Sequence, residues 1–311
     1  MTAPVGRAAA VLDNLAENAL AVSRLAEKRL GHVSELAETV IGELAAAGEV
    51  GSPRALLSAA SSVFSSLLSP AAPPADGLPR HRAALSATLS SLSATDRAYL
   101  AGSVLAAAER VLGRPLAPGD FADGTVPPPE VSRLVCVRNP HTERALLRFL
   151  PLIGAPTVAD RRDFTEVVDD VRGGHADYAV LPLRSGGVAL GSVSAMLEEH
   201  GLAVLATVTL DTEGGEAVFG LLGRRSVRLG PPTHFLFTSA LADVGLSGLF
   251  AAVEALPVLI ERCEPLPTPE GEDPLFRLAV RGEEAELVPF LVYLSLFVPG
   301  YIGHGFYFEL A

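Results

Sequence analysis

Residues 163–193 read DFTEVVDDVRGGHADYAVLPLRSGGVALGSV and carry the strongest structural pattern of the chain. A phenylalanine and three valines recur at helical spacing over residues 164–171, which predicts an amphipathic helix. Two glycines follow, where a helix needs a left-handed terminal residue. Residues 178–181 then form a short apolar run before Pro182, which predicts a buried strand. Because ligands in open α/β sheets bind at the carboxyl ends of strands, we expect the following loop, residues 184–191, to line a site.

The same stretch resembles the first lobe of the prephenate dehydratase family. That family has a helix, then G-x-A-D-Y-G-V-x-P-I-E-N-S as strand and loop, and then E-G-S-V at the start of the next helix. Here residues 174–183 read GHADYAVLPL and residues 191–193 read GSV. Arg184, Ser185 and Gly186 stand in place of the family's Glu-Asn-Ser. The resemblance implies an α/β lobe whose strand is kept and whose loop has changed.

The composition leaves room for two or three domains and argues against nucleic acid as a partner. The chain has 311 residues, is 49% hydrophobic and carries a formal net charge of −12, whereas nucleic acid requires a basic face. The sequence does not begin with a basic region and an apolar core, and its most apolar run, residues 290–298, is too short to span a bilayer. Cys136 and Cys263 lie in apolar strand-like contexts, and we interpret them as buried free thiols in a reducing compartment. We therefore expect a cytoplasmic protein with no membrane partner.

Residues 1–120 predict a helical domain. The helical regions cover residues 11–47, 52–68 and 80–112, the last with a restart at Thr95-Asp96 as an N-cap. Three helices, the first very long, resemble the helical type of chorismate mutase, which precedes prephenate dehydratase in the bifunctional enzymes of phenylalanine synthesis. Residues 51–55, GSPRA, resemble that family's D-P-x-R-E element without its Asp and Glu. The mutase substrate is a dicarboxylate, so the resemblance implies a basic pocket. The candidates are Arg24, Lys28, Arg29 and Arg54, each of which also fits a solvated charge on a helical face.

Residues 131–225 predict one α/β lobe. A buried strand over residues 134–137 leads to a helix that opens with Asn139-Pro140-His141-Thr142, where the dehydratase family has G-P-x-G-T-F-S. The N–H groups of such a helix start can bind an anion, or Thr142 can simply cap the helix. The family's catalytic T-R-F has its best local match in residues 217–219, AVF, which keep only the phenylalanine. Because the further stretch that builds the family's second lobe is absent as well, we do not expect ordinary prephenate dehydration.

Residues 232–311 resemble the ACT domain that ends the same enzymes, with elements in the order βαββαβ. Residues 246–253 resemble its P-G-A-L turn and helix, and residues 259–266 resemble the I-E-S-R-P element that helps to bind phenylalanine. The resemblance implies an effector site at Gly248, Leu249, Glu261 and Glu264. It also implies a homodimer, because ACT domains pair through free edge strands.

The predicted fold class is therefore multidomain α and α/β, with a chorismate mutase-like helical domain, one prephenate dehydratase-like lobe and an ACT-like domain. Two functions follow. The first is an enzyme or enzyme subunit of shikimate-derived aromatic metabolism, related to lyases and isomerases, that acts on a chorismate-, prephenate- or arylpyruvate-type carboxylate. The second is a catalytically silent protein that senses an aromatic amino acid through its ACT-like domain and regulates or scaffolds a partner enzyme.

The candidate site residues follow from the first function. Arg184 can clamp a carboxylate as a bidentate fork, although it also fits an ordinary surface loop. Neither function needs a cofactor, and the seven histidines show no metal-ligand spacing, so we expect no metal site. The predicted catalytic residues are Arg184, Ser185 and Thr142, and the predicted substrate-binding residues are Asn139, His141, Arg184, Ser192, Arg24, Lys28 and Arg54.

Overall fold

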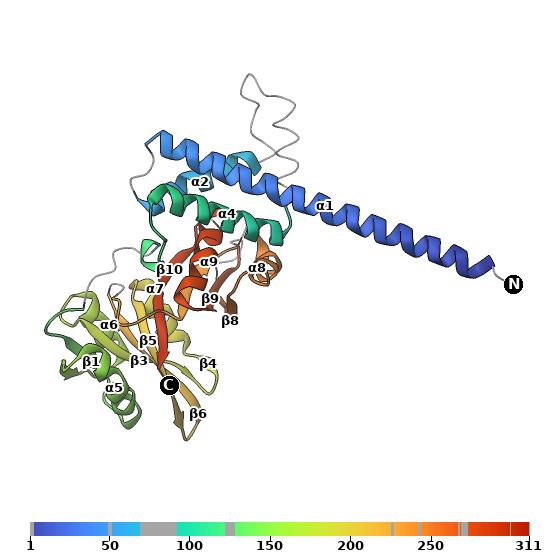
Figure 1. Ribbon diagram of the computed structural model, residues 1–311. Helices are drawn as coiled ribbons and strands as arrows, with labels where there is room; N and C mark the ends of the chain where they lie inside the picture. The colour runs from blue at the N-terminus through green and yellow to red at the C-terminus, as the bar shows by residue number, and fades with distance from the viewer. Residues whose placement is uncertain are drawn as a thin grey trace. The chain divides into compact units, whose positions relative to one another are not determined.

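The structure is a computed structural model that describes residues 3–48, 52–68, 92–121, 128–224, 227–241, 244–266, 268, 273–298 and 300–310. Figure 1 traces these residues in colour from the N-terminus to the C-terminus. The chain divides into two compact units, Met1–Pro115 and Leu116–Ala311. No helix in the described ranges combines the length and the apolar content that crossing a membrane requires.

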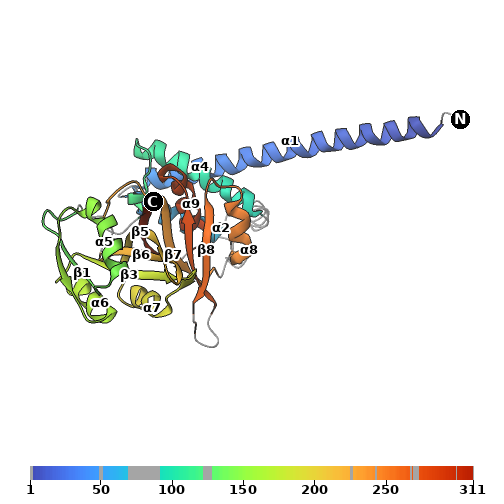
Figure 2. The ribbon, with the colours of Figure 1, turned by 90° about the horizontal axis from the view of Figure 1, so that it is seen from below.

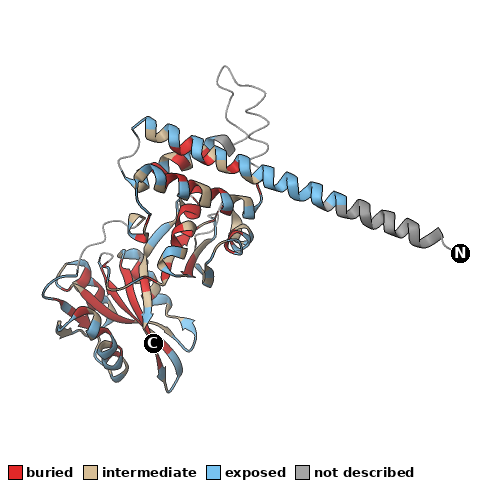
Figure 3. Cartoon of the chain, viewed as in Figure 1, coloured by how far each residue is buried: buried red, intermediate tan, exposed pale blue. Residues whose placement is uncertain are grey.

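The first unit is helical where it is described. It contains α1 (Ala3–Ala46), α2 (Pro53–Leu68) and α4 (Ala94–Leu112), and α1 contacts both other helices. A buried stripe near the end of α1, which includes Val33, Val40 and Ile41, shares the core of this unit with residues such as Phe64 of α2. Residues 20–29 of α1 are exposed instead, as Figure 3 shows. The long first helix was predicted from its periodicity. Among the α1 residues whose burial is described, 17, 18 and 20–46, buried apolar residues begin at Val33.

The start of α4 corrects the predicted N-cap at Thr95-Asp96. Ser93 is the N-cap, and its Oγ accepts a hydrogen bond from the backbone N–H of Asp96 at 3.2 Å. The Asp96 carboxylate in turn accepts from the backbone N–H of Ser93 at 3.0 Å, which completes a capping box. Residues 80–91 of the predicted third helical region lie outside the described residues. A short 3₁₀ helix, η1 (Pro118–Asp120), interrupts the predicted linker.

One mixed sheet organises the second unit (Figures 1 and 2). Its order is β2-β1-β3-β6-β5-β10-β7-β9-β8, and β4 pairs with β3. The β1–β2 and β1–β3 pairs are parallel, whereas β6 is antiparallel to both of its neighbours. The strands are β1 (Arg133–Cys136), β2 (Thr157–Asp160), β3 (Tyr178–Ser185), β4 (Val188–Ala189), β5 (Ala203–Thr212), β6 (Gly215–Gly223), β7 (His234–Ser239), β8 (Leu259–Leu266), β9 (Leu275–Arg281) and β10 (Ile302–Leu310).

Helices cover both faces of the α/β part of this sheet. The helix α5 (Pro140–Ile153) packs in a core with Leu134, Tyr178 and Phe219, whereas α6 (Phe164–Arg172) and α7 (Gly191–Glu199) pack in a second core with Val135 and Leu181. Neighbouring residues of one strand divide between the two cores because side chains alternate along a strand. The near-continuous apolar runs of β1 and β3 follow from this burial on both faces.

The stretch 163–193 folds as predicted except in its loop. Asp163 caps α6, and the buried valines of α6 are those of the predicted stripe. The strand β3 does not stop at Pro182 but continues to Ser185. Residues 184–189 then form a tight hairpin instead of an open loop, because Gly186 and Gly187 adopt φ angles of 55° and 79°. Two consecutive residues with positive φ are what a two-residue hairpin turn requires.

The predicted βαββαβ order is present in the C-terminal part. It comprises β7, α8 (Gly245–Val253), β8, β9, α9 (Glu284–Phe297) and β10, and the strands lie in the order β10-β7-β9-β8 with all pairs antiparallel. The strand β10 also pairs in parallel with β5, with Phe308 opposite Ala206. The α/β part and the βαββαβ part therefore share one continuous sheet.

Candidate functional site

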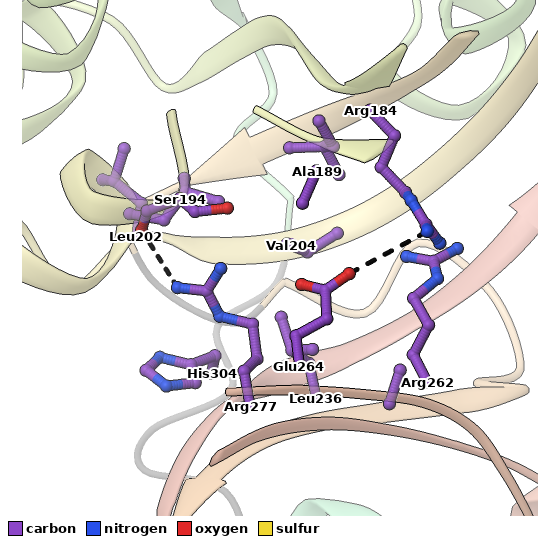
Figure 4. Close-up of a pocket in the computed structure, with 13 residues that line it drawn as sticks. Arg184, Ala189, Ser194, Leu202, Val204, Leu236, Arg262, Glu264, Arg277 and His304 are labelled. Atoms are coloured by element: carbon purple, nitrogen blue, oxygen red, sulfur yellow. Dashed lines mark hydrogen bonds and ion pairs between the residues drawn. The ribbon is translucent and has the colours of Figure 1, made fainter. Parts of the chain in front are cut away.

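A small arginine-lined pocket lies where the hairpin β3–β4 and helix α7 face the strands of the βαββαβ part (Figure 4). Its polar lining consists of Arg184, Ser194, Arg262, Glu264, Arg277 and His304, and leucine, valine and alanine side chains complete it. The enclosed volume is about 50 Å³, well below the roughly 300 Å³ at which small-molecule pockets begin. The pocket can therefore enclose one end of a ligand, such as a carboxylate group, but not a whole ring.

Arg184 reaches this pocket because β3 extends beyond Pro182. Its Nη2 donates to the Gly187 carbonyl oxygen at 2.5 Å and lies 3.9 Å from Glu264 Oε1. Its Nε is buried and has no hydrogen-bond partner among the described residues. Burial, and then the neighbouring positive charge of Arg262, hold the pKa of Arg184 below its usual value. Arg184 is thus a partly desolvated cation with a spare donor, which an anion would satisfy.

Arg277 and Arg262 bring two further guanidinium groups to the pocket. Arg277 of β9 is only 8% exposed, and its Nη2 donates to the Ser194 carbonyl oxygen at 3.0 Å. Figure 4 shows the Arg262 side chain beside that of Arg184, with Glu264 between them and Arg277. Three arginines against one glutamate leave the pocket positive, and a positive, mostly buried pocket favours an anionic ligand.

A polar cluster centred on His234 lies on the sheet close to the arginine pocket. His234 of β7 is 3% exposed, and its Nε2 lies 3.2 Å from Glu261 Oε2. Its ring stacks on Tyr307 with centroids 4.8 Å apart. Burial lowers the pKa of His234, against the opposing effects of Glu261 and Glu309, and burial raises the pKa of Tyr307. Arg262 and Arg184 also act electrostatically on Tyr307, which places this cluster close to the arginine-lined pocket.

A second cavity of about 210 Å³ lies on the opposite face of the sheet. Leu205, Phe306 and Phe308 line it, whereas Val204, the neighbour of Leu205, lines the arginine pocket. Its arginine, Arg228, is held by both carboxylate oxygens of Glu284 at 2.8 Å. Because Nη2 of Arg228 already donates to both oxygens of a carboxylate, this guanidinium is less available to a ligand carboxylate, so the arginine pocket is the better candidate site.

In the arginine pocket the structure brings together two of the residues predicted to form sites, Arg184 and Glu264. They were predicted to serve different sites, the substrate site and the effector site. Ser185 and Ser192 are exposed and do not line the pocket. Gly248 and Leu249 lie in α8, where Leu249 is fully buried, and Glu261 faces His234 instead of the pocket.

The start of α5 also differs from the predicted anion site. Asn139 Oδ1 accepts hydrogen bonds from the backbone N–H groups of His141 and Thr142, at 3.0 and 2.9 Å. Asn139 is therefore the cap, and Thr142, with 2% of its side chain exposed, is a buried residue of the first turn. Two of the N–H groups expected to receive an anion are thus already occupied.

In the first unit the candidate cations lie on helix surfaces. Arg24 and Lys28 belong to the exposed part of α1, and Arg54 is exposed at the start of α2. Arg29 pairs with Asp96 at 2.8 Å. These positions fit solvated charges on helical faces, and the mutase-like pocket stays a prediction.

Sequence reasoning missed Arg262, Arg277 and His304, which also line the pocket. Arg277 carried a usable signal, because it stands inside the apolar strand LFRLAVR, where a buried arginine needs partners. Arg262 lies within residues 259–266, which resemble the effector element, but was not singled out there. His304 carried no signal, since its position depends on how distant strands pair.

Comparisons with known proteins give partial structural likenesses. No protein-family model and no curated protein matches the sequence. The prephenate dehydratase of Streptococcus mutans has 18% identity and a TM-score of 0.47, and the match covers 58% of this chain and 100% of that one. GqqA, described as a novel type of quorum-quenching acylase, has 24% identity and a TM-score of 0.42 over 56% of this chain and 94% of its own. The prephenate dehydratase of Arthrobacter aurescens, solved with L-Phe, has 14% identity and a TM-score of 0.42 over 56% and 89%. At these TM-scores the likeness assigns no activity to this chain.

Proposed function

We propose that the arginine pocket binds the carboxylate group of a small chorismate-, prephenate- or arylpyruvate-type acid, and that the protein acts in shikimate-derived aromatic metabolism. The convergence of Arg184, Arg262 and Arg277 on one mostly buried pocket is the observation that carries this proposal. The resemblance of residues 174–183 to the prephenate dehydratase strand supports the class of acid.

Ligand binding needs more space than the pocket encloses. The β4 arm of the hairpin is the part that can provide it, because β4 has two residues and joins β3 through two residue pairs, whereas the β3 arm is paired with β6 as far as Ser185. The turn residues Gly186 and Gly187 are exposed. We expect the carboxylate to enter the pocket and displace Glu264 from Arg184, while the ring lies under a β4 arm that has moved outward.

Ordinary dehydration of prephenate is not part of this proposal. The strand that corresponds best to the family's T-R-F segment turns Ala217 and Phe219 into the core, with 6% and 4% exposed. Neither residue offers a hydroxyl or a guanidinium to the pocket. We expect no phenylpyruvate from prephenate and purified protein, and its formation would contradict this part of the proposal.

Calorimetric titration of the full chain with prephenate, chorismate and phenylpyruvate tests the binding function. At least one acid should bind, and Arg184→Ala and Arg262→Ala should each lower the affinity about 10-fold or more, as expected for a lost charge-assisted hydrogen bond. Arg172→Ala is the matched control, because it removes one exposed guanidinium of α6 that does not line the pocket. The proposal fails if no acid binds, or if both pocket variants bind like the wild type.

Glu264 favours a second candidate function, an amino-acid sensor. A pocket with arginines and one carboxylate suits a zwitterion, whose ammonium group would pair with Glu264 while its carboxylate pairs with arginine. Phenylalanine and phenylpyruvate separate the two functions, since only phenylalanine carries the ammonium group. Glu264→Gln should weaken phenylalanine binding if the protein is a sensor, and should leave or strengthen phenylpyruvate binding if it is not.

The predicted homodimer belongs to the same proposal. The strand β8 is the last in the sheet and pairs only with β9 among the described strands. Its outer edge is therefore the expected pairing surface. Light scattering on the full chain, repeated with a proline in place of Cys263 within β8, would show whether a dimer forms through this edge.

A further inference from the structure

We infer that the second unit binds a divalent transition-metal ion of the Zn²⁺ class between His234, Glu261 and Glu309. These side chains come from β7, β8 and β10, which are far apart in sequence and close together in the sheet. Each offers one ligand atom, and the three atoms lie within 4.8 Å of one another. One nitrogen and two carboxylate oxygens form a donor set that suits zinc, with a position left open for water or a ligand.

The distances fit such an ion. Zinc bonds of about 2.0–2.1 Å in a tetrahedral site place neighbouring ligand atoms about 3.3 Å apart. His234 Nε2 and Glu261 Oε2 are 3.2 Å apart, so this pair already has the required separation. With no pair of atoms more than 4.8 Å apart, Glu309 needs to move by at most about 1.5 Å. Glu309 is exposed, so a side-chain rotation can supply this movement.

Neighbouring side chains orient two of the three ligands, His234 and Glu309. The Oγ1 of Thr233 lies 2.8 Å from His234 Nδ1, so Nδ1–H can donate to this oxygen in the tautomer that leaves the Nε2 lone pair for a metal ion. The stacked ring of Tyr307 restricts the imidazole further. Thr209 Oγ1 donates to Glu309 Oε1 at 3.0 Å. A buried imidazole with one outer hydrogen bond and a stacked ring, facing two exposed carboxylates, has the layout of a histidine ligand in a metal site.

The surrounding charges narrow the choice of ion. Besides Glu261 and Glu309, the charged groups that act on His234 are Arg281 and Arg262. Two arginines against two carboxylates give little net attraction for a cation that binds only through charge. Ions that form directional bonds to nitrogen should therefore bind, whereas Mg²⁺, which prefers oxygen ligands in octahedral geometry, should not.

Calorimetric titration of the full chain with zinc chloride alone tests this inference, with magnesium chloride as the comparison ion. We expect one tight Zn²⁺ per chain and no Mg²⁺ binding. Glu261→Gln and Glu309→Gln should each lower Zn²⁺ affinity at least 10-fold, and circular dichroism should confirm that both variants fold. We choose the glutamates for substitution because they are exposed, whereas replacing the buried His234 could disrupt folding.

Two control variants separate this site from other zinc ligands. Glu216→Gln removes an exposed carboxylate of β6 outside the cluster and should leave the affinity unchanged. Cys263→Ser removes a half-buried thiol of β8 and should also have no effect. Absence of Zn²⁺ binding, wild-type affinity in the double variant Glu261→Gln/Glu309→Gln, or loss of binding in Cys263→Ser would each overturn the inference.

Discussion

Replacing Tyr178 with phenylalanine should stabilise the second unit. Tyr178 begins β3 and is 1% exposed, and its hydroxyl is buried with no hydrogen-bond partner among the described residues. A buried hydroxyl without a partner costs about 1–3 kcal/mol, whereas phenylalanine keeps the ring in the core. We expect the free energy of unfolding to rise by about 1 kcal/mol at neutral pH, which corresponds to about 2–4 °C in Tm for a unit of this size.

The effect should grow in alkaline solution. Burial, and then the adjacent carboxylate of Asp177, raise the pKa of Tyr178 to about 12. In the unfolded chain the pKa of tyrosine is about 10. Between these values the unfolded state loses a proton that the folded state keeps, so stability falls by about 1.4 kcal/mol per pH unit. The stability that the raised pKa of Tyr178 contributes is complete below about pH 10 and is lost by about pH 12. The loss is roughly 3 kcal/mol, which the phenylalanine variant does not suffer.

Urea unfolding of both proteins at several pH values, from neutral to about pH 11, measures the difference directly. Tyr99→Phe is the control, because Tyr99 of α4 is 41% exposed and belongs to the first unit. Its curve should follow the wild type at every pH. Easier unfolding of Tyr178→Phe than of the wild type at neutral pH would contradict this prediction, as would a difference in stability that stays constant while the pH rises.

Three further substitutions test single contacts by urea unfolding. Ser93→Ala removes the capping box of α4 and should cost about 1 kcal/mol, so an unchanged midpoint would contradict the cap. Asn139→Ala removes both cap bonds of α5 and should cost about 1–2 kcal/mol, most of which Asn139→Asp should restore. Gly220→Ala would place a Cβ 2.7 Å from Leu183 Cδ1, which should cost about 1–3 kcal/mol and weaken ligand binding, because Leu183 lines the arginine pocket. Ligand affinity equal to that of the wild type would show that Leu183 moves elsewhere.

Most of the fold could be predicted because the elements carry strong periodic patterns. The long first helix, the helix 164–171 and the strand from Tyr178 have clear apolar spacing, and each is present. The strand β2 was missed because it has four residues, of which the two end residues are exposed, so no pattern marks it. The hairpin at Gly186-Gly187 was missed although paired glycines are a local turn signal, because β4 is only two residues long.

The site could be predicted only in part, because strand pairing decides which side chains meet. Arg184 was singled out by its position after a buried strand, and Glu264 by its resemblance to an effector element. Arg184 and Glu264 meet in one pocket because β10 pairs with β5 of the α/β part and with β7 of the βαββαβ part. The grouping of His234, Glu261 and Glu309 depends on the same pairing and leaves no trace in sequence spacing.

The central place of β10 in the sheet has a consequence for synthesis of the chain. The strands β5 and β7 leave the ribosome well before residues 302–310, which pair with both of them. Until β10 is available, β5 and β7 each have an unpaired edge, and such edges favour aggregation. Completion of this sheet must therefore wait for β10 to emerge, and a translation product that stops before residue 302 should depend on chaperones to remain in solution.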